Sequence, residues 1–208
     1  MISIDVLLTF IAASALLSLA PGPDNIFVLT LSAVNGRESG LLVTLGLCTG
    51  LMFHTAAVVL GVAAVFQVNA VAFTALKIIG GCYLLYLAWQ AFRASSKHLE
   101  STERVNLGSM ALYKRGLIMN ITNPKVAIFF LAFLPQFADA SRGSIAVQMI
   151  VLGAIFIVVA LMIFSMIAIL SGYLNSWFSK SDKSQAVLNK VAGTVFIGLA
   201  LKLLLSEK

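Results

Sequence analysis

Two short polar motifs interrupt long apolar stretches of this 208-residue chain, and both carry side chains that could do chemistry. The first motif is PGPDN at positions 21–25, and the second is NITNPK at positions 120–125. Their main polar members are one carboxylate, three amides and one ammonium group: Asp24, Asn25, Asn120, Asn123 and Lys125. A carboxylate and an ammonium group can hold the opposite charges of a small zwitterion, and a carboxylate can also carry a proton. The sequence contains no GxSxG or HExxH motif and no acidic pair suited to catalysis, so we expect no catalytic residues and no enzyme.

The prolines of both motifs predict breaks in helices. Pro21, Pro23 and Pro124 lack a backbone donor and clash with the preceding turn, and Gly22 loosens the chain further. Each break leaves free carbonyls before it and free N–H groups after it. The partial positive charge of a new helix N-terminus suits a substrate carboxylate. We therefore expect substrate to be bound by the residues of both motifs: Pro21, Gly22, Pro23, Asp24, Asn25, Asn120, Asn123, Pro124 and Lys125.

The charges of the two motifs are expensive if they face lipid. Lys125 lies ten residues beyond Arg115, about 15 Å along a helix, so its side chain cannot easily reach the membrane surface. Facing lipid, Asp24 and Lys125 would each cost roughly 2.5–3.5 kcal/mol. We therefore expect an Asp24–Lys125 pair inside the protein that binds substrate or protons, Asp24 being the proton-coupling residue. A static ion pair that only fixes the helix register is the alternative.

Two further side chains are candidates for the site. His54 shares one helix face with four small residues that allow a neighbouring helix to approach closely: Gly46, Gly50, Ala57 and Gly61. It therefore faces protein, either as a hydrogen-bonded core histidine or as a proton relay. Tyr83, one turn after two glycines, could line the cavity and bind substrate, or could serve only interior packing.

The elements that must position these residues are membrane-spanning helices. The chain is 60% hydrophobic and 11% charged, with a mean hydropathy of +1.01, which a soluble domain of this size could not hide. Positions 39–76 and 143–179 carry no formal charge, and each run exceeds the roughly 20 residues that span a bilayer. Open strands would leave backbone groups unsatisfied in lipid, so we expect an all-α integral membrane protein. Apolar runs predict six spans: 4–34, 41–66, 70–92, 116–138, 145–174 and 187–205.

Positive charges predict the orientation of these spans. Eight Lys or Arg residues fall on one side and three on the other, which places the larger set in the cytoplasm and both termini outside. Lipid head groups explain these charges better than a nucleic acid does. The basic connector at 93–115 separates two halves, 1–92 and 116–208. Because each half has three helices, the second must be inverted, and inverted repeats whose first helices (1 and 4) are broken by proline are typical of secondary transporters.

The remaining features point away from other classes of function. The N-terminus lacks the positive region of a cleaved signal peptide, so we retain it as part of the first span. Cys48 and Cys82 lie singly in apolar segments, and we expect both to be buried and neither to bind a metal or cofactor. A membrane thiol–disulfide electron carrier and a non-transporting scaffold or sensor are the rival functions. No acidic cluster is present to bind a cationic side chain, which favours neutral substrates.

The motifs also resemble those of a known family. PGPDN in the first span, TNPKVAIFFLAFLPQF in the fourth and GGCYLLYLAWQAF at the end of the first half are similar to the lysine exporter and homoserine/threonine resistance family (LysE/RhtB) of bacterial amino-acid exporters. The resemblance covers nearly the whole chain. It implies export of amino acids across the cytoplasmic (inner) membrane in exchange for protons, often by a homodimer.

Overall fold

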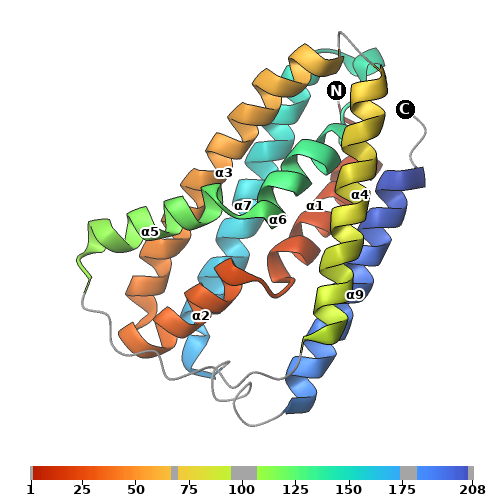
Figure 1. Ribbon diagram of the computed structural model, residues 1–208. Helices are drawn as coiled ribbons and strands as arrows, with labels where there is room; N and C mark the ends of the chain where they lie inside the picture. The colour runs from red at the N-terminus through yellow and green to blue at the C-terminus, as the bar shows by residue number, and fades with distance from the viewer. Residues whose placement is uncertain (1, 67–69, 95–106, 174–181, 206–208) are drawn as a thin grey trace.

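The computed structural model describes residues 2–66, 70–94, 107–173 and 182–205, and their regular secondary structure is entirely helical (Figure 1). Two helices, α3 (Arg37–Phe66) and α7 (Ile145–Ile169), are long and apolar enough to cross a membrane. Their outer faces expose large apolar side chains, such as Leu60 on α3 (75% exposed) and Met162 on α7 (60% exposed). Such surfaces suit lipid rather than water.

Both predicted helix breaks are confirmed. Helices α1 (Ile4–Leu19) and α2 (Pro23–Asn35) meet at an angle of 58°. Helix α5 (Ser109–Ile121) is bent by 50° from the segment Pro124–Phe137, which consists of α6 (Pro124–Ile128), a π-helical turn and a 3-10 turn. Each bent pair has the length and composition of one membrane span.

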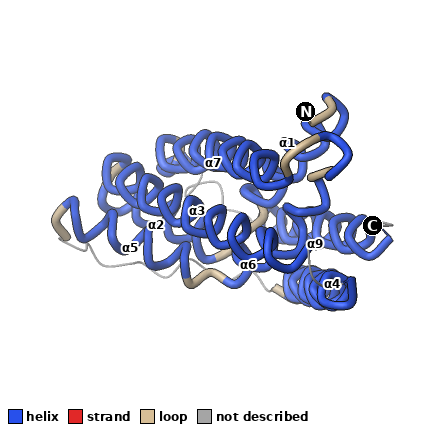
Figure 2. Tube along the Cα trace, turned by 90° about the horizontal axis from the view of Figure 1, so that it is seen from above, coloured by secondary structure: helices blue, strands red, loops and turns tan. Residues whose placement is uncertain are grey.

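The other two long helices pack against each other. Helices α4 (Ala70–Arg93) and α9 (Asp182–Leu205) have 24 residues each and lie side by side, as both views show (Figures 1 and 2). Helix α5 begins seven residues before the predicted start of its span, within the predicted connector 93–115. The predicted turn at 67–69 and most of that connector lie outside the described residues.

Small residues bring α3 and α5 into close contact. A Cβ atom at Gly46 would meet the carbonyl of Tyr113, and one at Gly116 would meet the carbonyl of Val43. The predicted small-residue face of α3 is therefore confirmed at Gly46, whereas Gly61 at its far end has open space around it. This contact places the second helix break directly against α3.

Aromatic side chains hold the second bent segment to its neighbours. Ring centroids are 5.3 Å apart between Phe156 and Phe129, 4.8 Å between Phe129 and Phe133, and 5.0 Å between Phe133 and Phe137. Phe137 also meets Phe10 of α1 at 5.0 Å. All five rings are buried. The series thus ties α7, the π-helical turn and α1 into one core.

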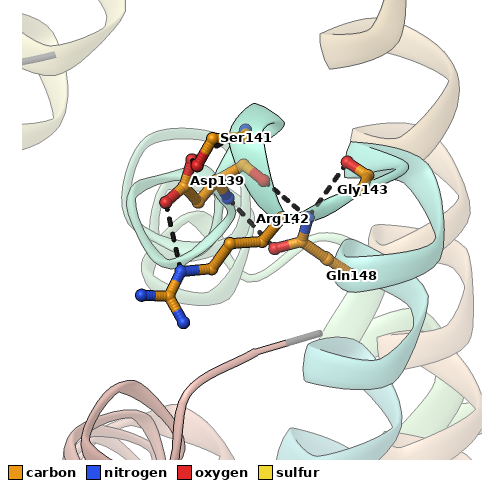
Figure 3. Close-up of polar contacts among 5 residues, drawn as sticks. All are labelled: Asp139, Ser141, Arg142, Gly143 and Gln148. Carbon is orange, nitrogen blue, oxygen red and sulfur yellow. Dashed lines mark hydrogen bonds and ion pairs between the residues drawn. The ribbon is translucent and has the colours of Figure 1, made fainter.

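A short polar loop fixes the end of this segment to the start of α7 (Figure 3). The Asp139 carboxylate accepts hydrogen bonds from the backbone N–H and hydroxyl of Ser141 at 2.9 and 2.7 Å and pairs with Arg142 at 3.4 Å. The Gln148 amide donates to the carbonyls of Asp139 (2.8 Å) and Gly143 (3.2 Å). These bonds anchor the chain where it turns back into the next helix.

One of the two cysteines is not buried as predicted. Both are unpaired; Cys48 on α3 is buried as predicted, but Cys82 on α4 is exposed. The prediction for Cys82 was wrong because an apolar span turns part of its surface toward lipid, where a small apolar side chain is at no disadvantage.

Candidate functional site

The first helix break exposes backbone carbonyls that side chains then satisfy. Pro21 and Pro23 cannot donate to the last turn of α1. The Asn25 amide instead donates to the carbonyl of Ser18 at 2.6 Å. The Lys125 ammonium group, which comes from the other half of the chain, donates to the carbonyl of Ala20 at 2.9 Å.

The second break is completed in the same way. Pro124 has no N–H to give to the carbonyl of Asn120, four residues earlier. That carbonyl oxygen instead accepts a hydrogen bond from the backbone N–H of Asn123 at 3.0 Å, and the His54 Nε2 atom of α3, also at 3.0 Å, supplies a second donor. The Asn123 side chain caps the new helix by accepting a hydrogen bond from the backbone N–H of Lys125 at 3.0 Å.

The two breaks meet around a small polar cavity. The Asn120 amide donates to Asp24 Oδ2 at 3.3 Å, which joins the second break to the first. Asp24, Asn120 and Lys125 are 3%, 1% and 7% exposed, so all three are buried. The cavity measures about 10 Å³, close to the smallest volume that holds one water molecule, and is therefore closed in this conformation. Its lining is Leu17, Ser18, Asp24, Leu51, Asn120, Lys125, Val126, Phe156 and Phe164.

The predicted Asp24–Lys125 pair is corrected in one respect. Both side chains line the cavity, as expected, but no oxygen of Asp24 lies within 4 Å of the Lys125 ammonium nitrogen. The ammonium group bonds to Ala20 because the broken turn leaves that carbonyl without a backbone donor. The two charges therefore share a site without neutralising each other by direct contact, which leaves both available to a ligand.

Several buried polar atoms at the breaks have no hydrogen-bond partner among the described residues. Three are acceptors, namely Asp24 Oδ1, Asn25 Oδ1 and Asn120 Oδ1, and a fourth, the Ser18 hydroxyl, can accept or donate. One is a donor, Asn123 Nδ2, on the residue that precedes Pro124. Buried polar groups are normally satisfied, so such a concentration around one cavity calls for a polar ligand or water.

The predicted site residues fall into three groups. Asp24, Asn120 and Lys125 line the cavity. The second group shapes the two breaks around it: Pro21, Gly22, Pro23, Asn25, Asn123 and Pro124. The remaining two lie elsewhere: His54 contacts the back of the second break, and Tyr83 lies on α4 with its ring 6.1 Å from that of Tyr86, outside the set that lines the cavity.

Sequence reasoning missed the rest of the lining. Ser18 could have been found, because it is a polar residue in an apolar helix one turn before Pro21. The apolar members carry no such signal, since aliphatic and phenylalanine side chains are common throughout the sequence. These residues are Leu17, Leu51, Val126, Phe156 and Phe164.

Long apolar helices and two breaks that meet at a buried, charged cavity define an integral membrane protein with the kind of site found in secondary transporters. The family model for LysE type translocators matches residues 15–207, so the chain belongs to that family. The chain is 33% identical to the homoserine/homoserine lactone efflux protein of Salmonella typhi, over 90% of each chain.

Two other relatives cover a similar length. The chain is 30% identical to the leucine efflux protein of Salmonella typhimurium, over 94% of this chain and 92% of that one. It is 31% identical to the uncharacterized membrane protein YrhP of Bacillus subtilis, over 94% and 97%. No solved structure matches. The family resemblance inferred from the two proline motifs is thereby confirmed, and the relatives with a stated function are efflux proteins rather than enzymes.

Proposed function

We propose that this protein is a secondary active transporter that exports neutral amino acids across the bacterial cytoplasmic membrane in exchange for protons. The observation that carries the proposal is the set of unpartnered polar atoms around the closed cavity. Efflux relatives that cover nearly the whole chain agree with the direction of transport and with a substrate of this class.

The unpartnered acceptors match the ammonium group of an amino acid. Ser18 Oγ, Asp24 Oδ1 and Asn120 Oδ1 belong to residues that line the cavity, and a primary ammonium group has three N–H donors. The Asp24 carboxylate supplies the opposite charge, which strengthens these bonds.

A second group in the cavity matches a carboxylate. The Lys125 ammonium group makes one hydrogen bond, to Ala20, and has two further protons to donate. The unpartnered Asn123 Nδ2 belongs to the same break as Lys125. One zwitterion would therefore satisfy donors and acceptors at both breaks.

We base proton exchange on the two ligands that the Asp24 carboxylate can bind, a proton and an ammonium group. A carboxylate that holds a proton no longer attracts an ammonium group, so proton and substrate compete for the same side chain. His54 is linked to this carboxylate through Asn120, whose carbonyl meets the ring and whose amide meets Asp24. We assign His54 to proton coupling on that connection. One charge moving through 100 mV provides about 2.3 kcal/mol, enough for a gradient of roughly fifty-fold.

Helix packing supports the proposed inverted repeat of six spans, with halves at 1–92 and 116–208. In the repeat, α1 and α2 correspond to α5 and α6, α3 corresponds to α7, and α4 corresponds to α9. The α3–α5 contact therefore corresponds to the α7–α1 contact, and both contacts occur. Gly80 and Gly193 are equivalent in the repeat; Gly193 of α9 leaves room for Phe92 of α4, and Gly80 of α4 leaves room for Ala132 of the π-helical turn and for Leu203 of α9. Such repeats open alternately to each side.

Asp24→Asn tests the proposal directly. We expect the purified variant to insert and remain folded in proteoliposomes but to lose export driven by an imposed pH gradient. Asp5→Asn is the matched control, because Asp5 is an exposed carboxylate in the first turn of α1. The proteoliposomes would be pre-loaded with labelled neutral amino acids, and export would be measured as release of the label. Proton-coupled export by Asp24→Asn at the wild-type rate would refute the assignment.

A further inference from the structure

The cavity has a second, apolar wall that the binding of a zwitterion does not use. Its polar lining comes from the two breaks, whereas most of its apolar lining is formed by Leu51 of α3, Val126 of α6, and Phe156 and Phe164 of α7. Each of these side chains is no more than 5% exposed. A ligand held by its ammonium and carboxylate groups would direct its remaining substituent toward this wall.

Helix α7 contributes two rings to this wall. Phe156 and Phe164 are eight residues apart, about 12 Å along the helix, and both line the cavity. Ala160, which lies between them in the sequence, is fully buried and does not belong to the lining.

The two rings are held differently. Phe156 packs against Phe129 at 5.3 Å and Phe130 at 5.0 Å, so the aromatic core fixes it. Phe164 has no ring partner among the described residues and can change rotamer at lower cost. The Phe156 part of the wall is therefore rigid, whereas the Phe164 ring can adjust to the length of the substituent.

We propose that Phe156 and Phe164 form the apolar side of the pocket that selects aliphatic and other uncharged amino acids, with Phe164 setting the upper limit of size. This inference rests on the proposed function and goes beyond it by naming the residues that choose among substrates. A charged substituent is rejected because the wall offers it no polar partner. The ammonium and carboxylate groups of the amino acid, bound at the two breaks, contribute the same binding free energy for every substrate.

The test compares the rates at which different amino acids are exported from proteoliposomes under a fixed pH gradient. Wild-type protein would be loaded with labelled alanine, valine, leucine, phenylalanine, lysine or glutamate, and the rate of export measured for each. We expect the uncharged members to be exported and the two charged members to be rejected. Truncation by Phe164→Ala should raise the ratio of phenylalanine to alanine export about tenfold or more, because small changes in pocket volume alter selectivity by such factors.

A further variant and a control make the result decisive. Phe164→Leu retains an apolar core contact, and so tests the pocket even where the alanine variant is too unstable to purify. Phe53→Ala is the matched control, because Phe53 on α3 is 57% exposed and does not belong to the cavity lining. It should leave every ratio unchanged.

The outcomes separate this inference from the proposed function. Export of uncharged amino acids with ratios unchanged by Phe164→Leu would overturn the pocket and leave the transporter intact. Efficient export of lysine or glutamate by the wild type would also overturn the pocket. Failure of the wild type to export any of the six would instead overturn the proposed function.

Discussion

Replacing Lys125 with methionine should destabilise the protein strongly, since it removes a contact between the two halves. The Lys125 ammonium group donates to the Ala20 carbonyl at 2.9 Å, and a hydrogen bond from a charged donor contributes about 1.5–3 kcal/mol. Methionine keeps most of the side-chain volume but leaves the buried carbonyl without this donor. It also leaves the Asp24 carboxylate buried with no positive charge in its cavity.

The size of the effect follows from these two losses. Removing one member of a buried charge pair costs roughly 3–5 kcal/mol, which for a chain of this length corresponds to a fall in Tm of roughly 6–20 °C. Removing both charges is often close to neutral. We therefore expect Asp24→Asn/Lys125→Met to be more stable than the sum of its single variants implies. Since the charged atoms are more than 4 Å apart, their coupling should be below about 4 kcal/mol at an effective dielectric constant of 20.

Thermal unfolding of the four proteins in one detergent measures this coupling as a double-mutant cycle. Lys114→Met is the control, because Lys114 is exposed on α5 and its removal should shift Tm little. A coupling energy below about 0.5 kcal/mol would show that Asp24 and Lys125 do not sense each other. That result would refute the view of the cavity as one charged site joining the two helix breaks.

Three other predictions concern glycines at close contacts and His54. Gly116→Ala should lower the free energy of unfolding by about 1–3 kcal/mol, because its Cβ atom would meet a backbone carbonyl of α3. Gly198→Ala is the control: it has open space around its Cβ atom and should be neutral or stabilising. Chemical denaturation would compare the two variants. Gly22→Ala places a Cβ atom 3.1 Å from the Lys125 ammonium nitrogen and should slow transport at nearly unchanged Tm, since the flexible lysine can move aside. His54→Gln keeps a donor for the second break, so folding should persist while the pH dependence of export changes; an unaltered pH profile would reduce His54 to a structural cap.

The breaks and the burial of their charges could be predicted from sequence, because both follow from local chemistry. Proline forbids a continuous helix wherever it stands, and a charge far from the membrane surface must turn inward. The arrangement of Asp24 and Lys125 around one cavity followed from that requirement. The Lys125–Ala20 bond did not, because a freed carbonyl can be satisfied by any donor that tertiary packing brings near.

The apolar part of the site could not be predicted for a different reason. Leu51 and Phe164 have no feature that separates them from other apolar residues of their helices. Only the packing of α7 and α3 against the breaks directs these two side chains to the cavity. For Tyr83, the position near two glycines left two roles open, in the cavity or in interior packing, and the lining of this cavity does not include it. Residue type identifies candidates for the site, whereas the rotation of each helix about its axis decides which apolar and weakly polar side chains face the cavity.

The two breaks depend on each other, and this dependence explains how a closed cavity could open at modest cost. The first break needs Lys125 for its carbonyl, and its Asp24 carboxylate is met by Asn120 of the second. Neither contact is a direct ion pair, and each could be exchanged for a bond to the ammonium or carboxylate group of a ligand. The number of satisfied polar groups would then change little between a closed and a loaded state. A static pair that fixed the helix register would instead bring Asp24 and Lys125 into direct contact, and the structure keeps them apart.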